Sequence, residues 1–246
     1  MRLGNPNKLL LIIALFSSLF AFTGCGGGSN ESVNPPYPSS DALNNWHWRN
    51  PLPQGNPLRG VTYGNGIFIA VGYGGTILTS ADGITWTSRT SGTTTNLLGV
   101  TYGNGIFIAV GDRGTILTSP DGINWTSRTS GITVWLSGVT YGNGTFIIVS
   151  YRTILTSPDG ITWTSRASGI INSLNGVTYG NGTFIAVGGD SLHGTIGTIL
   201  TSADGITWTS RASGTTDGLS GVTYGNGTFV IVGDFGTIIQ SDPVAL

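Results

Sequence analysis

The chain is built from one sequence unit that recurs five times from residue 58 onward. Each copy contains the anchor Gly-Val-Thr-Tyr-Gly-Asn-Gly, and the anchors begin at Gly60, Gly99, Gly138, Gly176 and Gly221. Successive anchors are therefore 39, 39, 38 and 45 residues apart. A period of about 40 residues in a β-rich sequence is typical of propeller blades, whereas solenoid β-repeats are shorter. The repeat predicts an all-β fold with five blades.

Each of the first four units carries four short strand signals separated by turn-forming residues. In the first unit these signals are residues 60–63, 68–71, 76–79 and 84–87. Gly64-Asn65-Gly66 lies between the first two, and Ala81-Asp82-Gly83 lies between the last two. Both favour tight hairpins, because Asn, Asp and Gly tolerate positive φ. The second signal is apolar throughout, so both of its faces must be covered, as they are when four-stranded antiparallel blades stack.

A strand signal that is missing at the C-terminal end of the chain occurs before the first unit. The fifth unit stops at residues 237–242 and lacks the fourth strand signal. Residues 46–49, Trp-His-Trp-Arg, match residues 86–89, Trp-Thr-Ser-Arg. We therefore expect residues 46–49 to supply the outer strand of the last blade. Such pairing closes a five-bladed β-propeller over residues 46–246 and removes its exposed sheet edges.

The first 24 residues are typical of a signal peptide. Basic residues at positions 2 and 8 precede the mostly apolar residues 9–22. These 14 residues would rise only about 21 Å as a helix, against a hydrocarbon core of about 30 Å. The segment is therefore expected to serve export and not to span the membrane.

Cys25 is the only cysteine, and it directly follows Thr23 and Gly24. This arrangement resembles the lipobox of bacterial lipoproteins, in which the cysteine is acylated and becomes the N-terminus. The alternative is an ordinary signal peptide that leaves a soluble protein with a free thiol. Residues 25–45 are rich in Gly, Ser, Asn and Pro and predict a flexible tether. We expect an exported monomer, lipid-anchored to the bacterial cell envelope at the outer membrane or cell surface.

Composition argues against several function classes. From Cys25 onward there is no lysine, and eight arginines against eleven acidic residues leave a formal charge of −3. Nucleic-acid binding needs a dense basic surface, which this charge does not provide. The two histidines, His47 and His193, have no metal-ligand spacing to Cys or carboxylates. We therefore expect no metal, no cofactor and no catalytic constellation.

One hairpin of the unit resembles a known repeat. Residues 80–86, Ser-Ala-Asp-Gly-Ile-Thr-Trp, recur at 119–125, 157–163 and 202–208 with few changes. They resemble the Asp-box, or BNR, repeat of sialidase-type propellers, with one residue fewer between Asp and Trp. The adjoining Val-Gly-x-x-Gly-Thr-Ile-Leu-Thr-Ser is similar to the Ycf48-like propeller repeats of photosystem assembly factors and of many secreted bacterial proteins. The resemblance covers about residues 46–242 and implies a fold more than a function.

A sialidase activity does not follow from this resemblance. The family would imply a tyrosine nucleophile activated by a glutamate, and the only glutamate here is Glu31, in the tether. The repeated charged residues are interpreted as structural. The arginines, expected to bond neighbouring carboxylates or carbonyls, are Arg49, Arg89, Arg128, Arg166 and Arg211. The aspartates, expected to cap backbone N–H groups, are Asp82, Asp121, Asp159 and Asp204.

Residues that differ between the units are the binding candidates. The two invariant turns share one face of the ring, so the other face carries the turns between strands two and three and the crossings between blades. This variable face collects aromatic and hydrogen-bonding side chains, as a recognition surface requires. The candidates are Tyr73, Asp112, Arg113, Trp135, Tyr151, Arg152, Asp190, His193, Asp234 and Phe235.

Three functions are compatible with this pattern. The first is a non-enzymatic, membrane-tethered module that binds a protein or cell-envelope partner through the variable face. The second is a multivalent carbohydrate-binding propeller with repeated sites, for which the classes of Tyr63, Asn65 and Trp86 would matter. The third is a glycoside hydrolase using two of Asp112, Asp190 and Asp234, which would require inward-facing carboxylates.

Overall fold

The computed structural model describes residues 46–49, 55–189 and 197–243. The chain divides into two compact units, Met1–His47 and Trp48–Leu246, and every described strand lies in the second. The predicted signal peptide, Cys25 and the tether lie outside the described residues. Within the described ranges, no helix is long and apolar enough to cross a bilayer.

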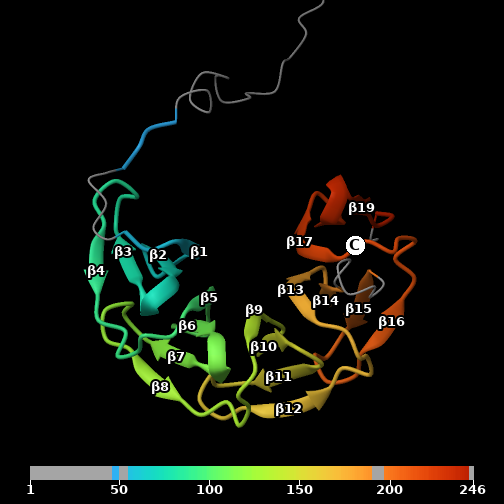
Figure 1. Cartoon of the computed structure of the whole chain (residues 1–246), viewed down its shortest axis with the longest axis horizontal. Helices are drawn as coiled ribbons and strands as arrows, with labels where there is room; N and C mark the ends of the chain where they lie inside the picture. The colour runs from blue at the N-terminus through green and yellow to red at the C-terminus, as the bar shows by residue number, and fades with distance from the viewer. Residues whose placement is uncertain (1–45, 50–54, 190–196, 244–246) are drawn as a thin grey trace, which may run out of the picture. The chain divides into compact units, whose positions relative to one another are not determined.

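Five antiparallel sheets, here called blades 1 to 5, follow the five repeats in order (Figure 1). Blade 1 contains β1 (Leu58–Gly64), β2 (Ile67–Gly72), β3 (Ile77–Ser80) and β4 (Thr87–Arg89). Blade 2 contains β5 (Leu97–Gly103), β6 (Ile106–Gly111), β7 (Ile116–Ser119) and β8 (Thr126–Arg128). Blade 3 contains β9 (Leu136–Gly142), β10 (Thr145–Ser150), β11 (Thr153–Ser157) and β12 (Thr164–Ala167). Blade 4 contains β13 (Leu174–Gly180), β14 (Thr183–Gly188), β15 (Thr198–Ser202) and β16 (Thr209–Arg211), and blade 5 contains β17 (Leu219–Gly225), β18 (Thr228–Gly233) and β19 (Ile238–Gln240).

The hydrophobic core lies between the blades. The cluster at the first junction contains Ile69, Val71, Ile77, Leu97, Val100, Phe107, Ala109 and Leu117. The second strand contributes to both of its junctions, because Phe107 and Ala109 face blade 1 while Ile108 and Val110 join the cluster with blade 3. Equivalent clusters lie at the remaining junctions. The prediction that the apolar second strand is covered on both faces is confirmed.

The turn between the first two strands of each blade has the predicted tight geometry. Asn65 and Gly66 adopt φ values of 46° and 79°, and the corresponding Asn-Gly pairs repeat this left-handed conformation. Asparagine and glycine are the residues that reach this region most readily, and a two-residue turn of this kind matches the twist of the strands. The Asn-Gly pair therefore fixes the register of every first hairpin.

The fourth strand begins three residues later than the sequence predicted. The Asp82 carboxylate accepts hydrogen bonds from the N–H groups of Ile84 and Thr85, each at 2.8 Å, and from the Ser80 hydroxyl at 3.0 Å. These bonds hold residues 84 and 85 in the turn, so pairing with β3 starts only at Thr87. The same bonds lower the pKa of Asp82 to about 2, with the N–H of Thr85 as the largest cause. The interpretation of the repeated aspartates as turn caps is confirmed.

The repeated arginines also serve their own blades, although their partner differs from the expected one. Arg89 donates from Nε to the Thr79 hydroxyl on the neighbouring strand at 2.9 Å. Arg128, Arg166 and Arg211 make the same bond to a threonine of their own blade. The acceptor is a hydroxyl, not the expected carboxylate or carbonyl. Arg89 pairs with Ile77 in the β3–β4 register, so Thr79, two residues further along β3, is its diagonal neighbour on the same face.

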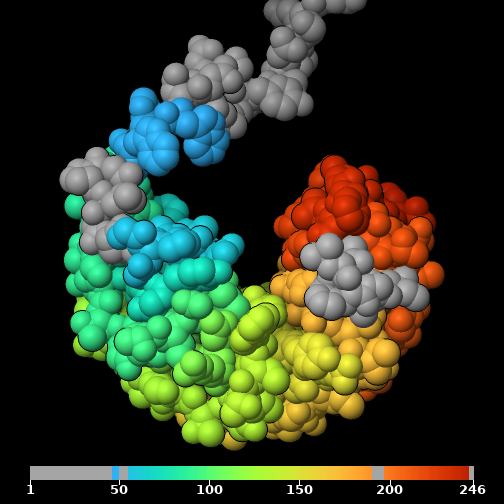
Figure 2. Space-filling model, viewed as in Figure 1, coloured from blue at the N-terminus to red at the C-terminus, as the bar shows by residue number. Residues whose placement is uncertain are grey.

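The ends of the repeat array remain apart. Blade 5 has three strands, and residues 46–49 form no strand, with Trp46 and Trp48 exposed. Each blade packs on the next from blade 1 to blade 5, and no comparable packing joins β17 to β1 among the described residues. In Figure 2 blades 1 and 5 do not touch. The order and number of sheets agree with the repeat, whereas closure by residues 46–49 stays a prediction.

A glycine at the end of the first strand in blades 1 to 4 permits the close stacking of consecutive blades. A Cβ at Gly142 would lie 2.1 Å from the ring of Tyr179 in the next blade. That ring also packs on Phe184 of its own blade, with centroids 4.6 Å apart. The tyrosine therefore has no room to withdraw without leaving its own aromatic partner.

We predict that Gly142→Ala lowers the free energy of unfolding by about 1–3 kcal/mol, because the added methyl overpacks this contact. The control is Gly55→Ala, because nothing lies within 4 Å of a Cβ at this exposed glycine, which also lies outside the left-handed region. Chemical denaturation of both variants measures the difference. Equal effects at the two positions would contradict the stacking argument.

Candidate functional site

A groove opens on the variable face across blades 3, 4 and 5. Its volume is about 980 Å³. It is formed by the β8–β9 and β12–β13 connections and by the β10–β11 and β18–β19 turns, together with positions on the first strands. The residues on which the following argument depends are Trp135, Tyr151, Arg152, Ile171, Asn175 and Asp234.

Large apolar side chains of the groove are exposed to solvent. The exposed fraction is 68% for Trp135, 74% for Ile171 and 46% for Tyr151. They come from three different connections, and the groove brings them together. Concentrated apolar exposure on one face of a small domain is typical of an interaction site. The indole of Trp135 is the largest such surface in the groove.

Arg152 is held in place by two contacts. Its Nε donates to the carbonyl oxygen of Ile171 at 2.7 Å, and its guanidinium carbon lies 4.6 Å from the centroid of the Tyr151 ring. Stacking and a backbone bond together fix the plane of the guanidinium, while the residue remains exposed. The groove therefore presents a preorganised positive charge beside apolar surface.

Asn175 connects two blades within the groove. Its side-chain amide donates to the carbonyl oxygens of Gly189 at 3.1 Å and Leu219 at 2.9 Å, which belong to blades 4 and 5. Sequence reasoning missed this residue because it lies inside a nearly invariant strand. The signal was present, because the second residue of that strand reads Arg59, Leu98, Ser137, Asn175 and Ser220 in the five units.

The turn between the second and third strands carries bulky residues in a backbone conformation that favours glycine. Blade 1 has Gly74 at this turn with a φ of 64°. The turns of blades 2 and 5, which have the same length, hold Arg113 and Phe235 at φ values of 57° and 53°. The turn of blade 3 is one residue shorter and holds Arg152 at 61°. A residue with a Cβ costs about 1–2 kcal/mol in the left-handed region. Folding alone would favour glycine at these three places.

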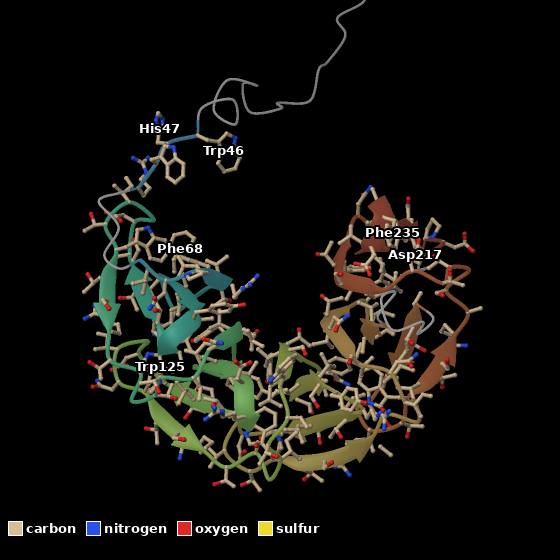
Figure 3. The ribbon with its side chains drawn as sticks, viewed as in Figure 1. Trp46, His47, Phe68, Trp125, Asp217 and Phe235 are labelled. Atoms are coloured by element: carbon tan, nitrogen blue, oxygen red, sulfur yellow. The ribbon has the colours of Figure 1, made fainter. Side chains whose placement is uncertain are left out.

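The other predicted candidates are distributed differently. Tyr73 lies on blade 1, where the guanidinium of Arg59 bonds its hydroxyl and stacks on its ring. Asp112 accepts a 2.8 Å hydrogen bond from the Asn96 amide. Figure 3 labels Phe235, which shares the β18–β19 turn with Asp234 but is not part of the groove lining. Asp190 and His193 lie outside the described residues.

The residues proposed for repeated carbohydrate sites are engaged in blade contacts. The Trp86 indole donates to the Gly83 carbonyl at 3.2 Å, and the Tyr63 ring packs on Phe68 with centroids 4.6 Å apart. Asn104, the counterpart of Asn65, reaches the backbone of Pro158 in the next blade. Each of these side chains thus contacts its own blade or the next one, which favours a structural role for the repeated residues.

Acidic residues do not gather into a catalytic or metal site in the described part of the chain. Asp112 and Asp234 lie on blades 2 and 5, and only Asp234 lines the groove. No group of three His, Cys, Asp or Glu residues that could hold a metal occurs among the described residues.

The sheet order and blade packing define a repeat protein with the β-propeller fold. No protein-family model matches the sequence, and no curated protein matches it. Solved structures do match. YCF48 from Cyanidioschyzon merolae aligns with a TM-score of 0.60 and 19% identity, over 80% of this chain and 70% of that one.

Two further structures support the same fold. A structure of YCF48 bound to D1 peptide aligns at a TM-score of 0.60 and 18% identity, over 76% of this chain and 64% of that one. The WD40 β-propeller domain of Doa1 aligns at 0.59 and 16% identity, over 77% and 66% of the two chains. This chain thus spans about two thirds of the length of these propellers.

We predict that Arg113→Gly raises the free energy of unfolding by about 1 kcal/mol, because it relieves the left-handed strain at an exposed side chain. Arg113→Ala is the control, since it removes the side chain and keeps the strain. Denaturation curves of both variants check the prediction. A glycine variant no more stable than the alanine variant would show that this turn stores no strain.

Proposed function

We propose that this protein is a non-enzymatic binding module whose groove accepts an extended peptide segment of a protein partner. The observation that carries the proposal is Arg152. It keeps a left-handed backbone and a stacked guanidinium in the same groove as the exposed Trp135, although glycine is the residue that this backbone conformation favours. Strain that folding does not require is typical of residues retained for a site.

The chemistry of the groove suits such a ligand. Trp135 and Ile171 offer apolar surface to a partner side chain, and tryptophan and arginine are enriched among residues that dominate binding energy. Arg152 and Asp234 supply opposite charges along the groove. The solved structure of YCF48 bound to D1 peptide provides a precedent for a similar fold that binds a peptide.

We predict that Trp135→Ala and Arg152→Ala each weaken peptide binding about tenfold or more. The first variant removes the indole surface of the groove, and the second removes its positive charge. The probe is a peptide selected from a displayed random library against the full chain, and its affinity is measured by calorimetry. Ile161→Ala, an exposed residue outside the groove lining, serves as the control.

Two outcomes would overturn the proposed function. In the first, no peptide is selected while a glycan array yields several equivalent weak sites, and the carbohydrate alternative then replaces it. In the second, selected peptides bind the two groove variants and the Ile161→Ala control with the same affinity. Thermal unfolding of each variant verifies that lost binding does not reflect lost folding.

We also propose that the protein is exported and anchored to the bacterial cell envelope through acylated Cys25. The support is the apolar segment at residues 9–22 followed by Thr23, Gly24 and the single cysteine. Two or three acyl chains on one residue give stable membrane attachment, where a single chain gives only reversible binding.

We predict that Cys25→Ser abolishes metabolic labelling of the protein by a fatty-acid analogue and releases it from the membrane fraction of a bacterial host. Labelling followed by fractionation measures both effects. Because the only thiol of the chain is Cys25, no other cysteine can carry the label. Membrane retention of the serine variant would reject the anchor.

Ring closure belongs to the same proposal. We propose that residues 46–49 form the missing fourth strand of blade 5. The support is their match to residues 86–89 and the three-stranded sheet at the other end of the array.

A further inference from the structure

The last residue of the second strand is a glycine in four blades and a serine in blade 3. Each of these residues pairs with the leucine that begins the first strand of its own blade. Blade 3 is therefore the one blade with a side chain at this position. The glycines are Gly72, Gly111, Gly188 and Gly233, and the serine is Ser150 at the end of β10.

Glycine at this position permits a hydrogen bond between the turn that follows it and the preceding crossing, here called the turn–crossing bond. In blade 2, the N–H of Asp112 donates to the carbonyl oxygen of Asn96 at 3.0 Å. A Cβ at Gly111 would lie only 1.9 Å from this oxygen. Blades 1, 4 and 5 have the same bond at 2.8 to 2.9 Å, and a Cβ at their glycines would lie 1.9 to 2.3 Å from the acceptor. A side chain at this position is thus incompatible with the bond.

Blade 3 lacks the turn–crossing bond. Its donor and acceptor would be the N–H of Tyr151 and the carbonyl of Trp135, and these two groups form no hydrogen bond in the described structure. Tyr151 pairs instead with Ser173 of the following crossing. The bond is not restricted to one turn length, because blade 4 has it with a longer turn than blades 1, 2 and 5. The Cβ of Ser150 accounts for the difference.

The hydroxyl of Ser150 has a separate role. Ser150 is completely buried, and its hydroxyl donates to the carbonyl oxygen of Thr153 at 3.1 Å. The hydroxyl therefore closes the turn of blade 3, whereas the Cβ occupies the space that the Trp135 carbonyl would need for the turn–crossing bond. Substitutions that remove one group and keep the other distinguish the two roles.

The missing bond leaves an unpaired acceptor at the groove. Trp135 lines the groove, and its carbonyl accepts no hydrogen bond from the described residues. The next crossing differs, because the carbonyl of Ile171 accepts the Nε of Arg152 at 2.7 Å. An acceptor that loses water on binding must receive another donor, since an unsatisfied carbonyl weakens binding. The groove thus combines the exposed indole of Trp135 with a backbone acceptor at the same residue.

We infer that the Trp135 carbonyl accepts a backbone N–H of the ligand, and that Ser150 keeps this carbonyl unpaired in the free protein. The inference rests on the proposed function and narrows the ligand to an extended segment with an unsubstituted N–H beside the side chain that contacts the indole. Main-chain hydrogen bonds of this kind hold an extended peptide while neighbouring apolar surface selects its side chains. Proline is excluded at that ligand position, because it has no N–H. Ser150 is a positioning residue, since it is buried and acts through Trp135.

Ser150→Gly tests the positioning role on the full chain. Without the Cβ, the Tyr151 N–H is expected to bond the Trp135 carbonyl as in the other blades, and the affinity for the library-selected peptide is expected to fall about fivefold or more. Ser150→Ala is the matched control, because it removes the hydroxyl and keeps the Cβ. Its affinity is expected to stay within about twofold of the wild type. Chemical denaturation verifies that both variants fold.

Two results of this comparison would overturn the inference. In the first, the glycine variant binds the peptide as tightly as the wild type. In the second, the glycine and alanine variants lose the same affinity, which would assign the effect to the hydroxyl of Ser150.

A second measurement locates the donor on the ligand. Versions of the selected peptide carry an ester in place of one amide at a time, so each lacks a single N–H. One ester is expected to weaken binding to the wild type and to Ser150→Ala about fivefold, and to have no such effect on Ser150→Gly. If no ester weakens binding while Trp135→Ala and Arg152→Ala still do, the inference is rejected and the proposed function stands. Failure to select any peptide would overturn the proposed function, and the inference with it.

Discussion

The structure depends on the apolar packing of one blade against the next. A single blade is a small sheet with two apolar faces, and neither face can remain in water without loss of stability. The alternation of Phe107 and Ala109 with Ile108 and Val110 between two clusters satisfies both faces of β6 at once. Hairpin turns, the aspartate caps and the glycine beneath each tyrosine ring all serve to bring these faces together.

The sequence was most informative where the repeat acts locally. The Asn-Gly turns, the apolar second strand and the capping aspartates could be predicted because each is determined by residues close together in the chain. The sequence placed the start of the fourth strand too early. Strand propensity predicts that Ile84 and Thr85 pair with β3, but their N–H groups bond the Asp82 carboxylate instead. The predicted closure depends on how tightly successive blades turn, which no local residue pattern determines.

The candidate site was only partly accessible from sequence. Loop variation pointed to Trp135, Tyr151, Arg152 and Asp234, and the groove contains all four. Asn175 was not predicted, because it lies in a nearly invariant strand and only loop residues were considered as binding candidates. Its bonds to two blades depend on the three-dimensional arrangement of the blades. Conversely, Tyr73 and Asp112 lie on the variable face but do not line the groove. The position of a loop in the repeat gives the face on which it lies, but not which blades form a groove there.

The identity of the junctions bears on how such a chain can evolve. Because every blade offers its neighbours the same pair of surfaces, an unequal crossover that adds or removes one repeat creates no new kind of contact in the array. The gene can therefore change length in steps of one blade while the product keeps a packed core. In the proposed binding role, specificity would reside in the few loop residues that the duplication copies and that later mutation alters, so binding would diversify without redesign of the scaffold.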